Sequence, residues 1–153
     1  MHVEKPTFLL LLVSMLMSFS LLGQPPAPTG QEEIFRVVEE MPRFYKAECE
    51  AMTDENLRGS CAQQALLEFI YRNVKYPLTA KENRVVGTVV VTFVVETDGT
   101  LSGIRVVRDI GSGCGEEAAR VVELSDGQWV PGVQRGQLVR VQFNLPVKYS
   151  MGK

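Results

Sequence analysis

Histidine is almost absent from this sequence of 153 residues, because the one histidine is His2, next to the initiator methionine. Without a second histidine the chain cannot build a Ser-His-Asp triad or a Cys-His dyad, and most catalytic zinc sites are excluded too. The three cysteines contain no Cys-x-x-Cys pair. We therefore expect a protein that is not an enzyme and that holds no metal or other cofactor. A secreted hydrolase or redox enzyme is the alternative that these absences disfavour.

The chain also lacks a strong charge of either sign, since 16 basic and 18 acidic residues leave a net charge of −2. No basic field would attract nucleic acid, so nucleic acid is not an expected partner. The glycines at 111, 113 and 115 lack the full spacing of a dinucleotide-binding loop. No small-molecule substrate is therefore predicted. Hydrophobic residues at 45% and charged residues at 22% are typical of a globular domain.

No apolar run reaches the ~20 residues that a membrane-spanning helix needs. The longest run, residues 8–22, follows Lys5 and is interrupted by three serines, which is typical of a signal peptide. Gly23 is a small residue at the expected cleavage point, and a proline-rich stretch follows it. We predict a Sec-type signal peptide over residues 1–23, a spacer over 24–31 and one folded domain over 32–153. An uncleaved membrane anchor is the alternative.

Two hydrophobic periodicities alternate along the rest of the chain. Apolar residues at helical spacing follow Ser60, which forms a capping-box pattern with Gln63. Strict alternation predicts strands, and Asp98-Gly99 predicts a tight hairpin turn. The expected elements are a short strand 34–42, a loop from Cys49 to Cys61, a helix from 60 to before 76, strands 85–95 and 101–108, a helix 116–124 and a last strand 139–149. This order predicts an α+β fold, with a small antiparallel sheet of three core strands plus a short N-terminal strand, and two helices packed on one face.

Two of the three cysteines are expected to pair. Cys49 and Cys61 lie in a polar stretch of a chain that we expect to be exported, and an oxidising compartment favours a disulfide between them. Two free cysteines are the alternative. Cys114 lies between two glycines, with no base to activate it, so we expect an idle thiol and not a nucleophile.

An ordered set of motifs covers about residues 32–149 and resembles the C-terminal domain of TonB-family energy transducers, in the form common in Bacteroidetes. The motifs are Tyr76-Pro77-x-x-Ala80, Gly87-x-Val89-x-Val91-x-Phe93-x-Val95, Asp98-Gly99, Trp129-x-Pro131-Gly132 and Val141-x-Phe143-x-Leu145-Pro146.

The resemblance implies a periplasmic, protein-binding domain that acts in energy-coupled transmembrane transport and in protein transport. Its implied partner is the N-terminal TonB-box peptide of an outer-membrane TonB-dependent transporter, and the proton-driven motor proteins of the inner membrane are a second class of partner. Full transducers carry a membrane anchor with a histidine and a long proline-rich linker, whereas residues 24–30 are all that resemble a linker here. The alternative to an exported binding domain is a transducer anchored in the inner membrane and facing the periplasm.

The last strand is the predicted binding site. We expect an extended receptor peptide to add to it as a further strand, because Pro146 lacks an N–H and is tolerated mainly at a sheet edge. The resemblance also implies contacts from the residues just before Pro77. The predicted partner-binding residues are Asn73, Lys75, Tyr76, Leu138, Val139, Arg140, Val141, Gln142, Phe143, Asn144 and Leu145.

Overall fold

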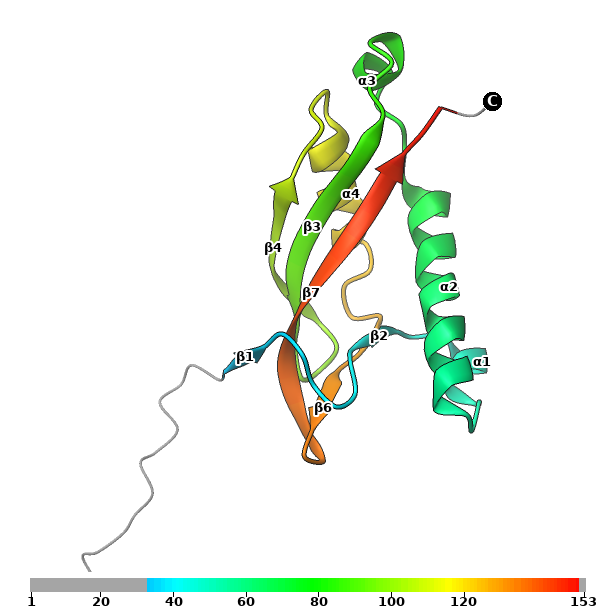
Figure 1. The fold of residues 1–153 in the computed structure, drawn as a ribbon, viewed down its shortest axis with the longest axis vertical. Helices are drawn as coiled ribbons and strands as arrows, with labels where there is room; N and C mark the ends of the chain where they lie inside the picture. The colour runs from blue at the N-terminus through cyan, green and yellow to red at the C-terminus, as the bar shows by residue number, and fades with distance from the viewer. Residues whose placement is uncertain (1–32, 152–153) are drawn as a thin grey trace, which may run out of the picture. The chain divides into compact units, whose positions relative to one another are not determined.

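The computed structural model describes residues 33–151. The predicted signal peptide and spacer, residues 1–31, lie outside this range. The elements, shown in Figure 1, are β1 (Ile34–Phe35), β2 (Arg43–Phe44), α1 (Ala47–Glu50), α2 (Glu55–Asn73), α3 (Leu78–Glu82), β3 (Gly87–Val95), β4 (Leu101–Arg108), α4 (Cys114–Glu123), β5 (Trp129–Val130), β6 (Gly132–Gln134) and β7 (Gln137–Tyr149).

The main sheet has the strand order β1-β7-β3-β4, and β6 pairs with the start of β7. Its three long strands are antiparallel, because β3 pairs with β4 on one side and with β7 on the other. The β3–β7 register runs from Gly87↔Tyr149 to Val95↔Val141 without a shift. The predicted α+β fold with three core strands is therefore confirmed. β1 is the exception to the antiparallel order, because it pairs with β7 in parallel.

One face of this sheet carries the hydrophobic core. β3 and β7 turn alternate apolar side chains toward it, and α4 packs on β3 and β4. Figure 1 shows α2 beside β7, and α2 also contacts α1 and β2. Both long helices contribute to the same core, through Ala65, Leu66 and Ile70 of α2 and Ala118, Val121 and Val122 of α4.

A cluster of aromatic rings joins β2, β3, β5 and β7 within this core. The Trp129 ring lies 5.2 Å from those of Phe93 and Phe143, centroid to centroid, and 6.0 Å from that of Phe44. The indole N–H of Trp129 donates to Ser125 Oγ at 3.1 Å, so the one polar group of this buried ring is satisfied. Trp129 therefore has a packing role.

The predicted strand 34–42 is wrong beyond Phe35. After that residue the chain leaves β7, and Glu40 forms a bridge with Val133 of β6. Two backbone hydrogen bonds of 3.1 and 2.9 Å make this bridge, and Val38 is buried. A contact with a strand distant in sequence therefore ends β1 early, and local sequence carries no sign of it.

The predicted loop between Cys49 and Cys61 is also wrong, because α1 and the first turns of α2 occupy it. Asp54 is the N-cap of α2, and its carboxylate accepts from the N–H of Leu57 at 3.0 Å. Ser60 lies inside the helix and donates to the carbonyl of Asn56. The capping-box interpretation of Ser60 therefore placed the N-cap six residues too late, at Ser60 and not at Asp54.

The structure joins Cys49 and Cys61 in a disulfide with a Cα–Cα distance of 5.5 Å, which ties α1 to α2. In the chain-entropy model, closing a loop of this length contributes ~3 kcal/mol. Cys114 is a free thiol, fully buried. Burial raises its pKa, and the nearby Asp109 and Glu116 raise it further, which suits an unreactive thiol.

The aromatic cluster generates a stability prediction. Phe93→Ala should lower the free energy of unfolding by ~3–5 kcal/mol, since Phe93 is 1% exposed and its ring touches those of Trp129 and Phe143. Urea denaturation followed by circular dichroism measures the change. Val107→Ala on β4, where the side chain is 55% exposed, is the control and should cost less than ~1 kcal/mol. If both variants lost the same free energy of unfolding, the aromatic cluster would not be a main contributor to stability.

Candidate functional site

The pairing of β7 changes along its length. Residues 137–139 pair with β6, residues 140 and 141 pair with β1, and Val141 is also the last partner in the β3 ladder. From residue 142 to residue 149, β3 is the only strand among residues 33–151 that pairs with β7. The other edge of this stretch therefore offers backbone N–H and C=O groups that no described strand uses.

This arrangement corrects the expectation that the whole last strand is a sheet edge. Leu138 and Val139 have β6 as a partner, and Arg140 and Val141 have β1. Arg140 is further held by Glu96, whose two carboxylate oxygens accept from its guanidinium at 2.6 and 2.9 Å. These hydrogen bonds lower the pKa of Glu96. The first half of β7 is therefore committed to structure, and the second half is the open edge.

A groove of about 620 Å³ lies along this open edge. One wall is the outer part of β7 from Phe143 to Pro146, and the other is the face of α2 that carries Leu66 and Leu67. Residues 39–44 and Trp129 also line the groove. Its lining mixes apolar and polar side chains, and it lies beside backbone groups of β7 that no described strand uses, which suits an extended peptide.

Charged side chains line part of the groove, among them those of Glu39, Arg43 and Arg58. Arg43 donates from Nε and a terminal nitrogen to the two oxygens of Glu50, at 2.9 and 2.6 Å, and these bonds lower the pKa of Glu50. The carboxylate of Glu39 accepts a hydrogen bond from the backbone N–H of Arg135 at 3.0 Å. The Nε of Arg58 is buried and has no hydrogen-bond partner within residues 33–151. Arg58 lines the groove, but its Nε is shielded from solvent.

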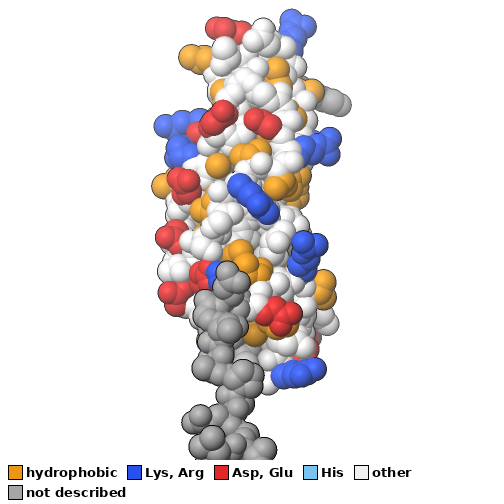
Figure 2. Space-filling view, turned by 90° about the vertical axis from the view of Figure 1, so that its left-hand side faces the viewer, with side chains coloured by type: hydrophobic (Ala, Val, Ile, Leu, Met, Phe, Trp, Pro, Cys, Tyr) orange, Lys and Arg blue, Asp and Glu red, His pale blue; other side chains and the backbone are white. Residues whose placement is uncertain are grey.

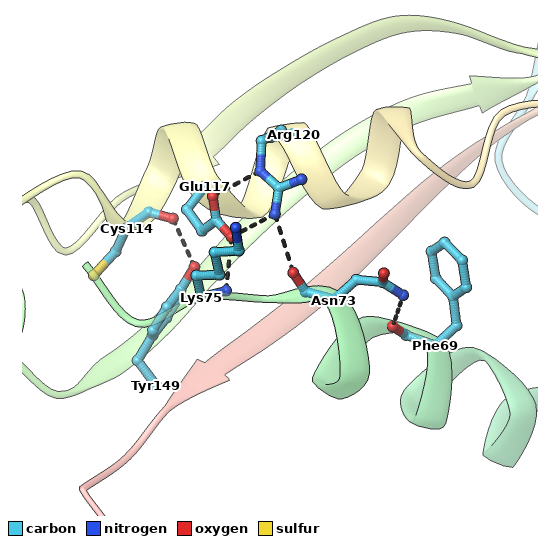
Figure 3. Close-up of polar contacts among 7 residues, drawn as sticks. All are labelled: Phe69, Asn73, Lys75, Cys114, Glu117, Arg120 and Tyr149. Atoms are coloured by element: carbon cyan, nitrogen blue, oxygen red, sulfur yellow. Dashed lines mark hydrogen bonds and ion pairs between the residues drawn. The ribbon is translucent and has the colours of Figure 1, made fainter.

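The predicted residues before Pro77 have structural contacts, drawn in Figure 3. The side-chain amide of Asn73 donates to the carbonyl of Phe69 at 2.7 Å, at the C-terminal end of α2. Arg120 of α4 donates to the carbonyl of Asn73 at 3.0 Å, and the backbone N–H of Lys75 donates to Glu117 at 2.7 Å. These bonds fasten the end of α2 to α4.

Tyr76 has a similar role at the far end of β7. Its hydroxyl donates to the carbonyl of Val85, and its ring packs edge-on against Tyr149 at 5.4 Å. The structure thus places Tyr76 near residue 149, while Leu138 belongs to the opposite end of the same strand. The two predicted groups do not form one patch, and the open edge of residues 142–149 lies between them.

The second edge of the sheet, β4, is less suited to strand pairing. Its register with β3 shifts twice, between Val90 and Val91 and between Thr92 and Val94, and Gly103 has a φ of +59°. Figure 2 views the molecule from this side and shows charged side chains of both signs spread between small hydrophobic groups. Irregular, charged edges resist strand addition, so β7 offers the more regular template.

Sequence reasoning missed the first residues of the α2 wall, residues 55–59 with Arg58, because it treated residues 49–61 as a loop. The signal was present: Asp54 followed by Glu55 is a common helix start. Within residues 33–151 no helix is long and apolar enough to cross a membrane. The same described residues contain no cluster of His, Cys, Asp and Glu that could hold a metal ion.

Comparison with known proteins gives the family of this chain. Residues 72–151 match the family described as Gram-negative bacterial TonB protein C-terminal, and the chain belongs to this family. Domains of this family are periplasmic, are associated with energy-coupled transport and interact with outer-membrane transporters; their fold is non-enzymatic. No curated protein matches the chain.

Two solved structures resemble this one. The solution structure of Helicobacter pylori TonB C-terminal domain residues 179–285 has a TM-score of 0.50 and 20% identity, covering 71% of this chain and 96% of that one. The solution structure of residues 194–285 of the same protein has a TM-score of 0.47 and 21% identity, covering 57% of this chain and 91% of that one. The longer of the two shows a shared fold.

The contact between α4 and the end of α2 generates a pH prediction. Hydrogen bonds from Arg120 lower the pKa of Glu117. A carboxylate with a depressed folded pKa contributes stability above its unfolded pKa of about 4.3, and this is lost as pH falls through the folded value. Glu117→Gln should therefore reduce the loss of stability between neutral pH and about pH 3.

Urea denaturation across this pH range measures the effect. Glu116→Gln is the matched control, because it removes the same charge from the same helical turn without touching residues 73–75. Parallel stability profiles for the wild type and Glu117→Gln would show that the ion pair contributes nothing.

Proposed function

We propose that this domain binds the N-terminal TonB-box peptide of an outer-membrane TonB-dependent transporter by strand addition to β7. The observation that carries the proposal is the second edge of residues 142–149, which no strand within residues 33–151 uses and whose residues 143–146 line the groove beside α2. Bound there, the peptide would link the receptor to this domain during energy-coupled transport. Main-chain hydrogen bonds would supply much of the affinity, with little dependence on side chains.

The regular β3–β7 ladder supports this mechanism. Val141, Leu145 and Val147 are buried in the core, and a slip of one residue would turn them out to solvent. The register of β7 is therefore fixed before a peptide arrives. The open stretch of eight residues spans roughly 26 Å at 3.3 Å per residue. Pro146 has no N–H and costs the added strand at most one hydrogen bond.

The proposed contacts with the peptide fall into three groups along β7. Gln142, Phe143, Asn144 and Leu145 would pair with the peptide directly. The added strand would end before the four residues that already pair with β1 or β6, which are Leu138, Val139, Arg140 and Val141. The residues at the other end, Asn73, Lys75 and Tyr76, would contact a peptide long enough to reach Tyr149, a position near Tyr76.

We also propose that the chain is exported to the periplasm by a signal peptide over residues 1–23. The Cys49–Cys61 disulfide supports an oxidising compartment. An uncleaved segment would instead anchor the domain in the inner membrane and bring it to the proton-driven motor proteins there. Mass spectrometry of the mature N-terminus separates the two forms. Binding, and not catalysis, is the proposed activity in both.

N-methylated peptides test the binding mechanism. A synthetic TonB-box peptide is made in two sets, each methylated at alternate backbone amides, and titrated into the full chain by calorimetry. In an added strand only every second amide faces β7, so one set should lose binding and the other should keep it.

The unmethylated peptide is the control for both sets. If the two sets bind as tightly as the control, strand addition is wrong, even if the domain still binds the peptide by another surface. If the unmethylated peptide does not bind, the proposed partner is wrong.

A further inference from the structure

We infer that the connecting segment between β1 and β2, residues 36–42, can close the open edge of β7, and that its contacts with β6 hold it away from that edge. The inference rests on the proposed binding of a peptide at β7 and adds a regulation of that site by the chain itself. In the closed arrangement, residues 36–38 would extend β1 and pair with residues 142–144. The segment and a peptide would then compete for the same backbone groups.

The register of β1 places the connecting segment at the start of the open edge. β1 lies on the same side of β7 as the open edge, because β3 occupies the other side. It runs parallel to β7, and its last residue, Phe35, lies opposite Val141. One further step in this register brings residue 36 opposite Gln142, where the open edge begins. The change of chain direction after Phe35 is therefore what ends β1 and leaves the edge open.

The side chains of the segment suit this pairing. Paired residues of neighbouring strands point to the same face of a sheet, so Val37 would lie beside Phe143 on the face that lines the groove. In the structure the side chain of Val37 is 81% exposed, so closure would bury apolar surface that now meets water. Arg36 would point to the opposite face of the sheet, with Gln142. Closure therefore gains both ladder hydrogen bonds and apolar burial.

Contacts with β6 hold the segment in its observed position, and Figure 1 shows it passing β6 on its way to β2. The backbone of Glu40 exchanges two hydrogen bonds with that of Val133, at 3.1 and 2.9 Å. The N–H of Glu39 donates to the side-chain oxygen of Gln134 at 3.1 Å, and the carboxylate of Glu39 accepts from the backbone N–H of Arg135 at 3.0 Å. Closure must break these bonds, so they set the balance between the two arrangements.

The position of β2 limits how far the segment can reach along β7. β2 pairs with β5, and the ring of its Phe44 contacts that of Trp129, which contacts Phe143. β2 is therefore close to the level of Phe143, and residues 39–42, which can span up to ~14 Å, are enough to join residue 38 to it. These four residues already line the groove beside the open edge. Closure by three residues is therefore compatible with the rest of the fold.

Variants of the β6 contacts test the inference in the full chain without a peptide. Glu39→Ala combined with Gln134→Ala removes the side-chain contacts and should shift the segment toward closure. Alternate amides of residues 142–144 should then exchange with solvent about 10-fold more slowly than in the wild type, as measured by NMR hydrogen exchange. Glu48→Ala is the control, because Glu48 is an exposed acidic residue of α1 that does not line the groove; it should leave this exchange unchanged.

Substitutions of Val37 assign the slow exchange to closure by the segment. Val37→Asp added to the double variant should restore the fast exchange of the wild type, because closure would bury a carboxylate beside Phe143. Val37→Ile is the matched control, since it keeps an apolar, β-branched side chain, and it should keep the exchange slow. Gln134→Ala alone, with a smaller effect of the same sign, serves if the double variant is poorly folded by circular dichroism.

The same variants are then titrated with the TonB-box peptide by calorimetry. The double variant should bind the peptide about 10-fold more weakly than the wild type, because the apparent affinity falls with the share of molecules whose edge is open. Adding Val37→Asp should restore the wild-type affinity.

The possible failures are distinguishable. Unchanged exchange of residues 142–144 in the double variant, or slow exchange that survives Val37→Asp, would overturn the inference and leave strand addition by a peptide intact. Weaker peptide binding that Val37→Asp does not restore would also overturn it, because the lost side chains would then act on the peptide directly. If the exchange results are as expected and the TonB-box peptide binds none of these proteins, closure is supported and the proposed function is wrong.

Discussion

The unshifted ladder between β3 and β7 is the constraint on which the rest of this structure depends. It pairs Gly87 with Tyr149 at one end and Val95 with Val141 at the other. This register turns alternate side chains of both strands into one core, where they meet α2 and α4. It also uses only one edge of residues 142–149 of β7, and so creates the surface that we propose for a peptide.

The elements outside the matched family region decide how accessible that edge is. β1 covers only two residues of β7 and then leaves it, because the bridge between Glu40 and Val133 takes the chain elsewhere. The disulfide and the bidentate ion pair between Arg43 and Glu50 hold α1, α2 and β2 together. The disulfide and these hydrogen bonds therefore hold the α2 wall of the groove in place, and they do not involve the open edge of β7.

Local sequence signals predicted the elements that local forces specify. Alternation in residues 139–149 gave a strand with Val141 and Leu145 inside. Asp98-Gly99 gave the hairpin turn, where Gly99 has a φ of +82° and a Cβ would lie 2.3 Å from the carbonyl oxygen of Trp129. What failed depended on partners distant in sequence: the end of β1 is set by β6, and the pairing of residues 138–141 is set by β1 and β6. Asp54 followed by Glu55 did indicate the start of α2, but Ser60 was taken as the start of the helix.

The most direct test of the account is amide hydrogen exchange of the full chain, measured by NMR with and without a TonB-box peptide. Alternate amides of residues 142–149 should gain protection when the peptide binds, because an added strand takes up those N–H groups. The amides of β4 (Leu101–Arg108) should be unchanged. Peptide-induced protection on β4, or binding without any new protection on β7, would contradict the claim that the open edge of β7 is the binding site.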